Sequence, residues 1–156
     1  MEGRMNSVKI YNVINKPTLV QTVLEWHKRE WPKPNVGVDS IKKRIIGTSD
    51  SQLPVTLVAV DGTEAVGFVS MIFHAESEEK GRPHWIDAVY VELSHRNKGV
   101  ASLLIRAIQQ AAIGMKIEQL HALTEIPILY EKNGWGIAER IPPRDFIMNK
   151  MVSEEG

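Results

Sequence analysis

The hydrophobic positions of the chain recur with the periods of strands and helices, in blocks separated by Pro, Gly, Asn and Asp. In the first part of the chain this pattern predicts strands at 8–14, 55–60, 65–73 and 85–93, and helices at 18–30 and 39–46. In the second part it predicts a helix at 100–115, a strand at 119–124, a short helix at 127–133 and a terminal hairpin at 137–152. The order β α α β β β α β α β β indicates an α/β or α+β mixed sheet whose first half is largely antiparallel.

The segments are bounded by residues that commonly begin helices or form turns. Asp39 or Ser40 is the expected N-cap of the second helix. Asp61-Gly62 predicts the turn of a hairpin. The segment 74–83 is rich in Glu, Lys, Gly and Pro, so we expect an exposed loop whose acidic side chains are solvated.

The length of 156 residues favours a single domain over residues 1–156, with short tails at 1–6 and 153–156. Lys and Arg number 19 and Asp and Glu number 19, so the formal net charge is zero. This balance removes the usual electrostatic argument for a nucleic acid or an anionic membrane as partner. No apolar run approaches the ~20 residues of a membrane helix and no apolar signal core is seen, so we expect a cytoplasmic protein.

Residue types also restrict the chemistry. The sequence has no cysteine, which excludes a disulfide, a thiol nucleophile and a Cys-based metal site. The histidines do not have the spacing of metal ligands, so no metal is expected. They are His27, His74, His84, His95 and His121.

The most informative segment joins the strand that ends at 89–91 to the helix that begins after Gly99. A short polar loop leads into this helix, and backbone N–H groups at such a turn combine with the helix dipole to form an anion site. Arg96 and Lys98 add positive charge beside the turn. A phosphate or pyrophosphate group is therefore the expected ligand.

Two motifs resemble the GNAT superfamily of N-acetyltransferases. Arg96-x-x-Gly99-x-Ala101 resembles the acetyl-CoA signature of that family, (Q/R)-x-x-G-x-(G/A). The downstream segment 129–135, Leu-Tyr-Glu-Lys-Asn-Gly-Trp, is similar to the family's tyrosine-containing helix with its Gly-aromatic ending. The resemblance covers residues 85–152 well and the first half of the chain by topology. It implies a GNAT-like fold that uses acetyl-CoA as co-substrate and acts on an amine.

The resemblance also implies a set of residues along the cofactor. They are Val89, Tyr90, Val91, Arg96, Asn97, Lys98, Gly99, Val100, Ala101 and Ser102. Lys98 departs from the Arg or Gly that many members have beside the signature glycine. Thr124 and Pro127 stand where the family often has Asn and Ala, which puts in doubt a side-chain hydrogen bond to the cofactor from this strand.

Three residues are candidates for the catalytic steps. The resemblance assigns the N–H of Val91 to the thioester oxygen, at a bulge that splays the strand. Asp87 is the best-placed carboxylate for a base. It lies two positions before Val89, so we expect both side chains on the same face of the strand. The structural alternative for Asp87 is a salt bridge. Tyr130 fits the family's general acid toward the departing thiolate, with simple packing as its alternative.

The expected reaction is direct acetyl transfer from acetyl-CoA to an amine in a ternary complex. A catalytically silent CoA-binding regulatory module and an acyltransferase for longer acyl-CoA are the alternatives. The identity of the acceptor stays open, because the first helices and the terminal hairpin that would bind it carry no motif. A homodimer is possible. Trp26, Trp31 and Trp85 are expected as core or groove walls, and Glu25, Glu30 and Asp39 as exposed helix charges.

Overall fold

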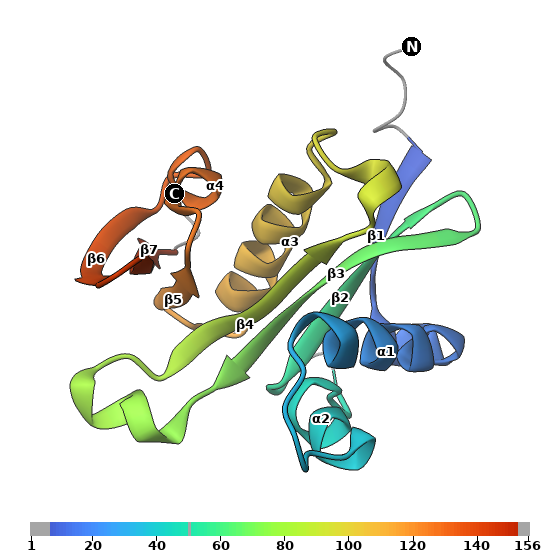
Figure 1. The fold of residues 1–156 in the computed structure, drawn as a ribbon, viewed down its shortest axis with the longest axis horizontal. Helices are drawn as coiled ribbons and strands as arrows, with labels where there is room; N and C mark the ends of the chain where they lie inside the picture. Colours follow the sequence, from blue (N-terminus) through green and yellow to red (C-terminus); the bar gives the residue numbers. More distant parts are fainter. Residues whose placement is uncertain (1–6, 50, 153–156) are drawn as a thin grey trace.

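A seven-stranded mixed sheet forms the centre of the chain in a computed structural model that describes residues 7–49 and 51–152 (Figure 1). The predicted tails at 1–6 and 153–156 lie outside the described residues. The sheet has the strand order β1-β2-β3-β4-β5-β7-β6. Its strands are β1 (Val8–Asn12), β2 (Val55–Asp61), β3 (Glu64–Phe73), β4 (His84–Val91), β5 (Gln119–Thr124), β6 (Gly136–Ile141) and β7 (Asp145–Met151).

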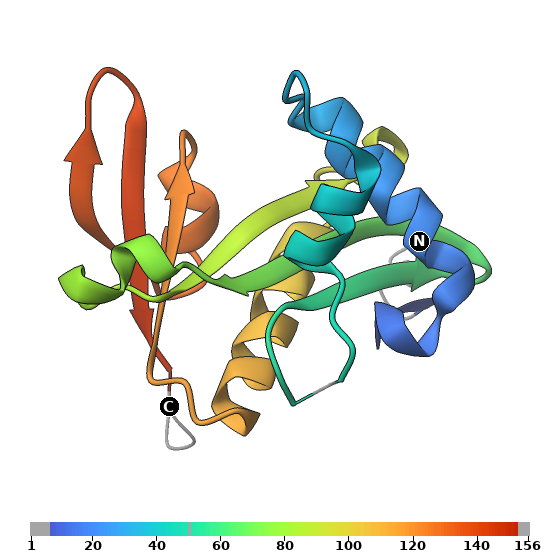
Figure 2. The ribbon, with the colours of Figure 1, turned by 90° about the horizontal axis from the view of Figure 1, so that it is seen from below.

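The sheet consists of two antiparallel parts joined by one short parallel pairing. Strands β1 to β4 pair antiparallel in chain order, and β7 pairs antiparallel with both β5 and β6. Strands β4 and β5 run parallel and pair at Trp85 with His121 and at Ile86 with Ala122. Beyond these positions the two parts of the sheet diverge (Figure 2).

A β-bulge marks the point where the pairing of β4 and β5 ends. On the β3 side, Ser70 pairs with Ala88 and Met71 pairs with Ile86, so Asp87 is the extra residue of β4. A bulge of this kind bends its strand and re-aims a side chain. The bulge and the opening in the sheet therefore begin at neighbouring residues of β4.

The helices cover the two faces of the sheet differently (Figure 2). Helix α3 (Val100–Gly114) packs on one face through a stripe of apolar residues at helical spacing, which includes the fully buried Leu104, Ile105 and Ile108. Helices α1 (Val20–Glu30) and α2 (Val38–Ile45) cover the opposite face. The candidate active site lies where the layer of α3 and the layer of α1 and α2 both end.

Helix α4 (Pro127–Glu131) is short and is fastened to α3 by the residues that follow it. Asn133 Nδ2 donates to Ser102 Oγ at 3.0 Å and to the carbonyl oxygen of Leu129 at 2.9 Å. Trp135 Nε1 donates to Gln109 Oε1 at 2.8 Å. The Asn-Gly-Trp sequence thus fixes the position of the tyrosine helix against α3.

The element order predicted from the sequence is confirmed, and the differences are local. Helix α2 begins at Val38 with Gly37 as N-cap and no side-chain cap, so the prediction of Asp39 or Ser40 as N-cap is wrong. Residues at the ends of strands and in the loop at 74–83 form 3-10 turns instead of strand or irregular loop. These turns are Val13–Asn15, Ala75–Lys80 and Leu93–His95.

Candidate active site

A groove of about 500 Å³ runs from the N-terminus of α3 along the end of β4. All of the residues predicted for the cofactor except Lys98 line it. They are Val89, Tyr90, Val91, Arg96, Asn97, Gly99, Val100, Ala101 and Ser102. Leu129 and Lys132 form part of the wall on the side of α4. The two sequence motifs therefore face the same groove.

The turn before α3 presents backbone N–H groups to this groove. Asn97 and Gly99 both have positive φ, at 63° and 86°, and Gly99 is the N-cap of α3 without a side-chain cap. The first N–H groups of a helix have no partner within the helix, and the positive end of the helix dipole lies there. Arg96 Nε donates to the carbonyl oxygen of Val91 at 2.8 Å, which ties the turn to β4. This geometry can hold an anion.

The last residues of β4 offer further backbone donors. The N–H of Glu92 donates to Val66 on β3 at 2.8 Å, and Val91 is opposite Gly67. Successive N–H groups of a strand point in opposite directions, so the N–H groups of Val91 and Val89 point away from β3 and toward the opening. The bulge lies at Asp87 and not at Val91. The N–H groups of Val89 and Val91 face the opening because the pairing of β4 with β5 ends at Ile86.

A second cavity of about 350 Å³ adjoins the groove and contains Tyr130. Four residues line both spaces, and they are Trp31, Val89, Ile126 and Leu129. The Tyr130 ring is 5% exposed and packs edge-on against Trp135, with ring centroids 5.0 Å apart. Its hydroxyl makes no hydrogen bond to any residue that the structure describes. Burial raises the pKa of Tyr130 above its usual value, so the phenol keeps its proton at neutral pH.

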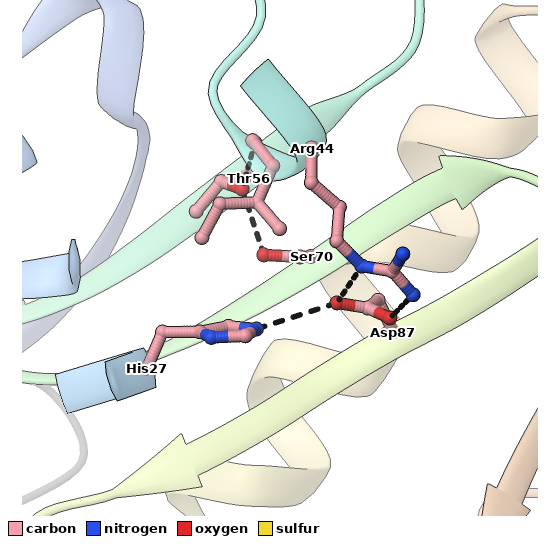
Figure 3. A network of polar contacts seen from close by, with 6 residues as sticks. His27, Arg44, Thr56, Ser70 and Asp87 are labelled. Atoms are coloured by element: carbon pink, nitrogen blue, oxygen red, sulfur yellow. Dashed lines mark hydrogen bonds and ion pairs between the residues drawn. The ribbon is translucent and has the colours of Figure 1, made fainter. Parts of the chain in front are cut away.

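Asp87 also borders this cavity, but its carboxylate is bound by side chains from α1 and α2 (Figure 3). Arg44 donates to it twice, from Nη2 at 2.7 Å and from Nε at 3.3 Å. His27 Nε2 lies 3.4 Å from Oδ2. Asp87 therefore points to the face of α1 and α2, whereas Val89 packs with the apolar cluster under α3. The prediction that the two share one alternation is wrong because the bulge shifts it.

The surroundings of Asp87 make it a poor proton acceptor. Burial by itself would raise the pKa of Asp87, but the hydrogen bonds from His27 and Arg44 and the charge of Arg44 outweigh it and hold the pKa at about 2. General bases work best with a pKa near the working pH. The geometry therefore favours the salt-bridge alternative over the predicted role as base.

Other parts of this site were not predicted from the sequence. Arg29 Nη2 donates to the Tyr90 hydroxyl at 2.6 Å, that hydroxyl donates to Glu92 at 2.9 Å, and Trp26 Nε1 donates to Glu92 at 3.1 Å. These bonds hold α1 against the end of β4. Their partners lie far apart in the sequence, and the sequence signal that could have found them is the apolar stripe of 19–31, which brings Trp26 to the sheet.

The three predicted tryptophans have different positions. Trp26 is buried in the core under α1, and Trp31 is a wall of both the groove and the Tyr130 cavity. Trp85 Nε1 donates to the carbonyl oxygen of Arg82 at 2.6 Å. The prediction of core or groove wall is thus confirmed for Trp26 and Trp31.

Residues 7–49 and 51–152 contain neither a metal-binding cluster nor a membrane-spanning helix. Within these ranges no group of three or more His, Asp or Glu side chains is arranged to hold a metal ion. None of the helices in the same ranges is long and apolar enough to cross a membrane.

Comparison with solved structures agrees with the fold. Among solved structures, an aminoglycoside 6'-acetyltransferase type Ii matches with TM-score 0.70 and 18% identity, over 92% of this chain and 96% of that one. Arabidopsis thaliana Naa50 in complex with a bisubstrate analogue matches with TM-score 0.65 and 18% identity, over 94% and 99%. Arabidopsis thaliana NAA60, also with a bisubstrate analogue, matches with TM-score 0.69 and 14% identity, over 96% and 99%.

Sequence comparison gives the family directly. No curated protein sequence matches the chain significantly. The family model for the acetyltransferase (GNAT) domain, however, matches residues 53–136, which include β4, the turn at Gly99, α3 and Tyr130. With this match over more than half of its length, the chain belongs to the GNAT acetyltransferase family.

Proposed function

We propose that the protein is an N-acetyltransferase that transfers the acetyl group of acetyl-CoA directly to an amine in a ternary complex. The observation that carries this proposal is the wall shared by the groove and the Tyr130 cavity, which includes Val89 on β4 and Leu129 on α4. A thioester lying along β4 would reach both spaces at that wall. The name of the first structural match above, an aminoglycoside acetyltransferase, is in keeping with an amine acceptor.

The residues at the start of α3 fit the pyrophosphate of CoA. The positive φ of Asn97 and Gly99 opens the turn, and the first N–H groups of α3 are free of side-chain caps. A side chain at the position of Gly99 would be strained in this conformation. Arg96 and Lys98 contribute positive charge near the turn, although Lys98 does not line the groove.

The end of β4 is suited to the acyl part of the co-substrate. When bound, acetyl-CoA supplies the thioester carbonyl that the acceptor amine attacks. We assign the N–H of Val91, with that of Val89 beside it, to donate to the oxygen on which negative charge develops. A fixed backbone donor stabilises this charge without having to reorganise.

Tyr130 and Asp87 have separate roles in the proton movements. Tyr130 holds its proton at neutral pH and has no competing partner among the described residues, so it can donate to the departing thiolate. Asp87 stays ionised in its ion pair with Arg44, which neutralises its charge and leaves it a poor proton acceptor. We assign removal of the amine proton to water in the cavity instead of to direct transfer to Asp87.

The experiment combines a binding and a turnover measurement. Calorimetric titration with CoA tests the groove, and release of free thiol from acetyl-CoA in the presence of a panel of amines tests the transfer. We expect CoA binding and amine-dependent thiol release, with reactions lacking amine as the control. Binding without thiol release for any acceptor would favour the CoA-sensing regulatory module. A faster reaction with longer acyl-CoA would favour the other alternative. A cytoplasmic location and a homodimer stay predictions.

A further inference from the structure

The end of β4 is held by the sheet on one side only. Strand β4 pairs with β5 at Trp85 and Ile86, and beyond them the described chain pairs it with β3 alone. The N–H groups of Val89 and Val91, which we assign to the thioester oxygen, lie on the unpaired side. Because no ladder holds this side, other contacts have to fix the direction of these two donors.

A chain of side-chain hydrogen bonds connects this end of β4 to helix α1. Arg29 Nη2 donates to the Tyr90 hydroxyl at 2.6 Å, and that hydroxyl donates to Glu92 Oε1 at 2.9 Å. Trp26 Nε1 donates to the other carboxylate oxygen, Glu92 Oε2, at 3.1 Å. Both oxygens of one carboxylate are therefore bound, one by a side chain of the strand and one by a side chain of the helix.

The members of this network that lie on β4 and just after it flank Val91 in the chain. They are Tyr90 and Glu92, and the N–H of Glu92 also donates to Val66 on β3 at 2.8 Å. The carbonyl oxygen of Val91 accepts from Arg96 Nε at 2.8 Å. Residues 90, 91 and 92 are thus each fixed by a hydrogen bond, and the N–H of Val91 is the donor held between them.

Packing of α1 on the sheet does not by itself need a carboxylate here. The rings of Trp26, Phe68 and Tyr90 already pack together, with Trp26 and Tyr90 centroids 5.2 Å apart. Glu92 is half-buried, and burial of a carboxylate is costly unless its oxygens are hydrogen-bonded. Burial and the hydrogen bond to Glu92 raise the pKa of Tyr90, so the phenol keeps the proton that it donates. The network adds a fixed direction, which ring contacts alone do not supply.

Resting on the proposed function, we infer that Glu92 is a positioning residue that holds the Val91 N–H in the direction required by the thioester oxygen. The described residues that line the groove do not include Glu92, so it acts through the backbone beside it. Donors to a developing oxyanion have to lie about 2.7 to 3.1 Å from the oxygen. A small rotation of the peptide at Val91 therefore weakens the transfer without weakening the hold on CoA.

Steady-state kinetics test this role with Glu92→Gln, which replaces one of the two acceptor oxygens by an NH2 group. We expect kcat to fall about tenfold, which is less than the loss of about 10² to 10³ for a missing oxyanion donor. The Kd for CoA, measured by calorimetry, should stay nearly unchanged, because the turn at Gly99 is not altered. An unchanged kcat in Glu92→Gln would overturn the inference.

A matched control and a second variant separate positioning from stability. Glu139→Gln removes a carboxylate oxygen that binds Arg82 at 2.8 Å, away from the groove, and should leave kcat unchanged. Tyr90→Phe removes the central hydroxyl of the network. Because Tyr90 and Glu92 share one hydrogen bond, the effects of the two variants on kcat should add less than fully in the double variant. Full additivity, or an equal loss of kcat in Glu139→Gln, would contradict the role of Glu92.

Infrared spectra of bound acetyl-CoA give a readout that does not depend on turnover. A hydrogen bond from the Val91 N–H lowers the stretching frequency of the thioester carbonyl, which an isotope label on that carbon separates from the protein bands. We expect a lowered frequency in the parent and in Glu139→Gln. The lowering should be smaller in Glu92→Gln and in Tyr90→Phe. The same frequency in Glu92→Gln as in the parent would rule out positioning by Glu92.

The same spectra distinguish this inference from the proposed function. If CoA binds but no amine is acetylated, the proposed transfer fails, and the carbonyl frequency still decides the inference. A lowered frequency in the parent that is lost in Glu92→Gln supports positioning. A carbonyl of bound acetyl-CoA that shows no lowering in the parent overturns it, whatever the rate of transfer.

Discussion

The two faces of the sheet differ in the kind of residues that they bury. The face under α3 is packed by an apolar cluster, and the groove beside it includes the turn at Gly99 and the end of β4. The face under α1 and α2 contains buried polar side chains, among them His27, Thr56 and Ser70, and the ion pair of Arg44 with Asp87. The arrangement on the first face therefore depends on backbone conformation, and the arrangement on the second depends on the identity of side chains.

This difference has a consequence for substitutions. On the α3 side, a change is harmful where it alters backbone conformation or blocks the approach of a phosphate. On the α1 and α2 side, a change is harmful where it leaves a buried polar group without its partner. Four variants test this difference between the two faces.

The largest effect is expected for Gly99→Glu. The side chain adds bulk and negative charge at the anion site, and φ of 86° is unfavourable for any residue with a Cβ. CoA binding measured by calorimetry should be abolished. The control Gly114→Glu makes the same change at the far end of α3, where an added Cβ meets open space, and should bind CoA normally. Unchanged affinity in folded Gly99→Glu would contradict the site.

The second effect is expected for Tyr130→Phe, which removes only a hydroxyl. Because this group has no partner among the described residues, stability should change little. Loss of a general acid should lower kcat by about 10² with nearly unchanged affinity for acetyl-CoA. Steady-state kinetics and calorimetry measure the two quantities. Tyr11→Phe on β1 serves as the control, and turnover of Tyr130→Phe at the parent rate would make Tyr130 a packing residue.

The third effect concerns Asp87 and the stability of the fold. The pKa of Asp87 is about 2 in the folded protein and has an ordinary value of 3.8. A lowered folded pKa stabilises the protein above the unfolded pKa, by about 2 kcal/mol here, and this stabilisation is lost as pH falls from about 4 to about 2. The difference in unfolding free energy between the parent and Asp87→Asn should therefore shrink over that range.

Denaturant unfolding at several pH values checks this prediction. Asp39→Asn, at an exposed position in the first turn of α2, is the control and should show a smaller change. A constant difference for Asp87→Asn would mean that its ion pair contributes little. The pH profile of kcat/KM adds a kinetic readout, since parallel profiles for parent and Asp87→Asn agree with a charge role. A profile that changes shape in Asp87→Asn would restore Asp87 as the base.

The smallest effect is expected for Asn133→Ala. This change removes the hydrogen bonds to Ser102 and Leu129 that fasten α4 to α3. We expect a loss of about 1 to 2 kcal/mol in unfolding free energy and a few-fold lower kcat, because Tyr130 is held less firmly. Asn15→Ala, at an exposed position outside the site, is the control. An unchanged melting temperature for Asn133→Ala would show that the apolar contacts of α4 suffice.

Local patterns predicted the element order, and nine of the ten residues predicted along the cofactor line one groove. The strand at 119–124 has the predicted bounds, because a period-two pattern decides it within a few residues. The turn at Gly99 was predictable because one short motif contains both the glycine that the backbone conformation requires and the basic residues beside it. The N-cap of α2 was not, because Val36 and Val38 pack against the cluster under α1 and extend the helix toward its N-terminus.

The acceptor side was less predictable for physical reasons. A single extra residue at Asp87 reverses the alternation of β4, and no local signal marks it. Its partners His27 and Arg44 lie 60 and 43 positions away in the sequence. Pairings of this kind arise from the packing of α1 and α2 on the sheet. Periodicity predicts that these helices exist, but it does not predict which of their polar side chains meet.

The short pairing of β4 with β5 has a consequence for cooperativity. Within the described chain the ladder between the two parts of the sheet contains two residue pairs, so we expect the part formed by β5, β6, β7 and α4 to open with a free energy below that of global unfolding. A ligand in the groove would contact both parts, since residues of β4 and of α4 line it, and would bind when they are together. At a concentration of 100 Kd it would add about 2.7 kcal/mol to that opening free energy. Amide hydrogen exchange in β5 and β7 should then slow with CoA, and two separately unfolding units should become one.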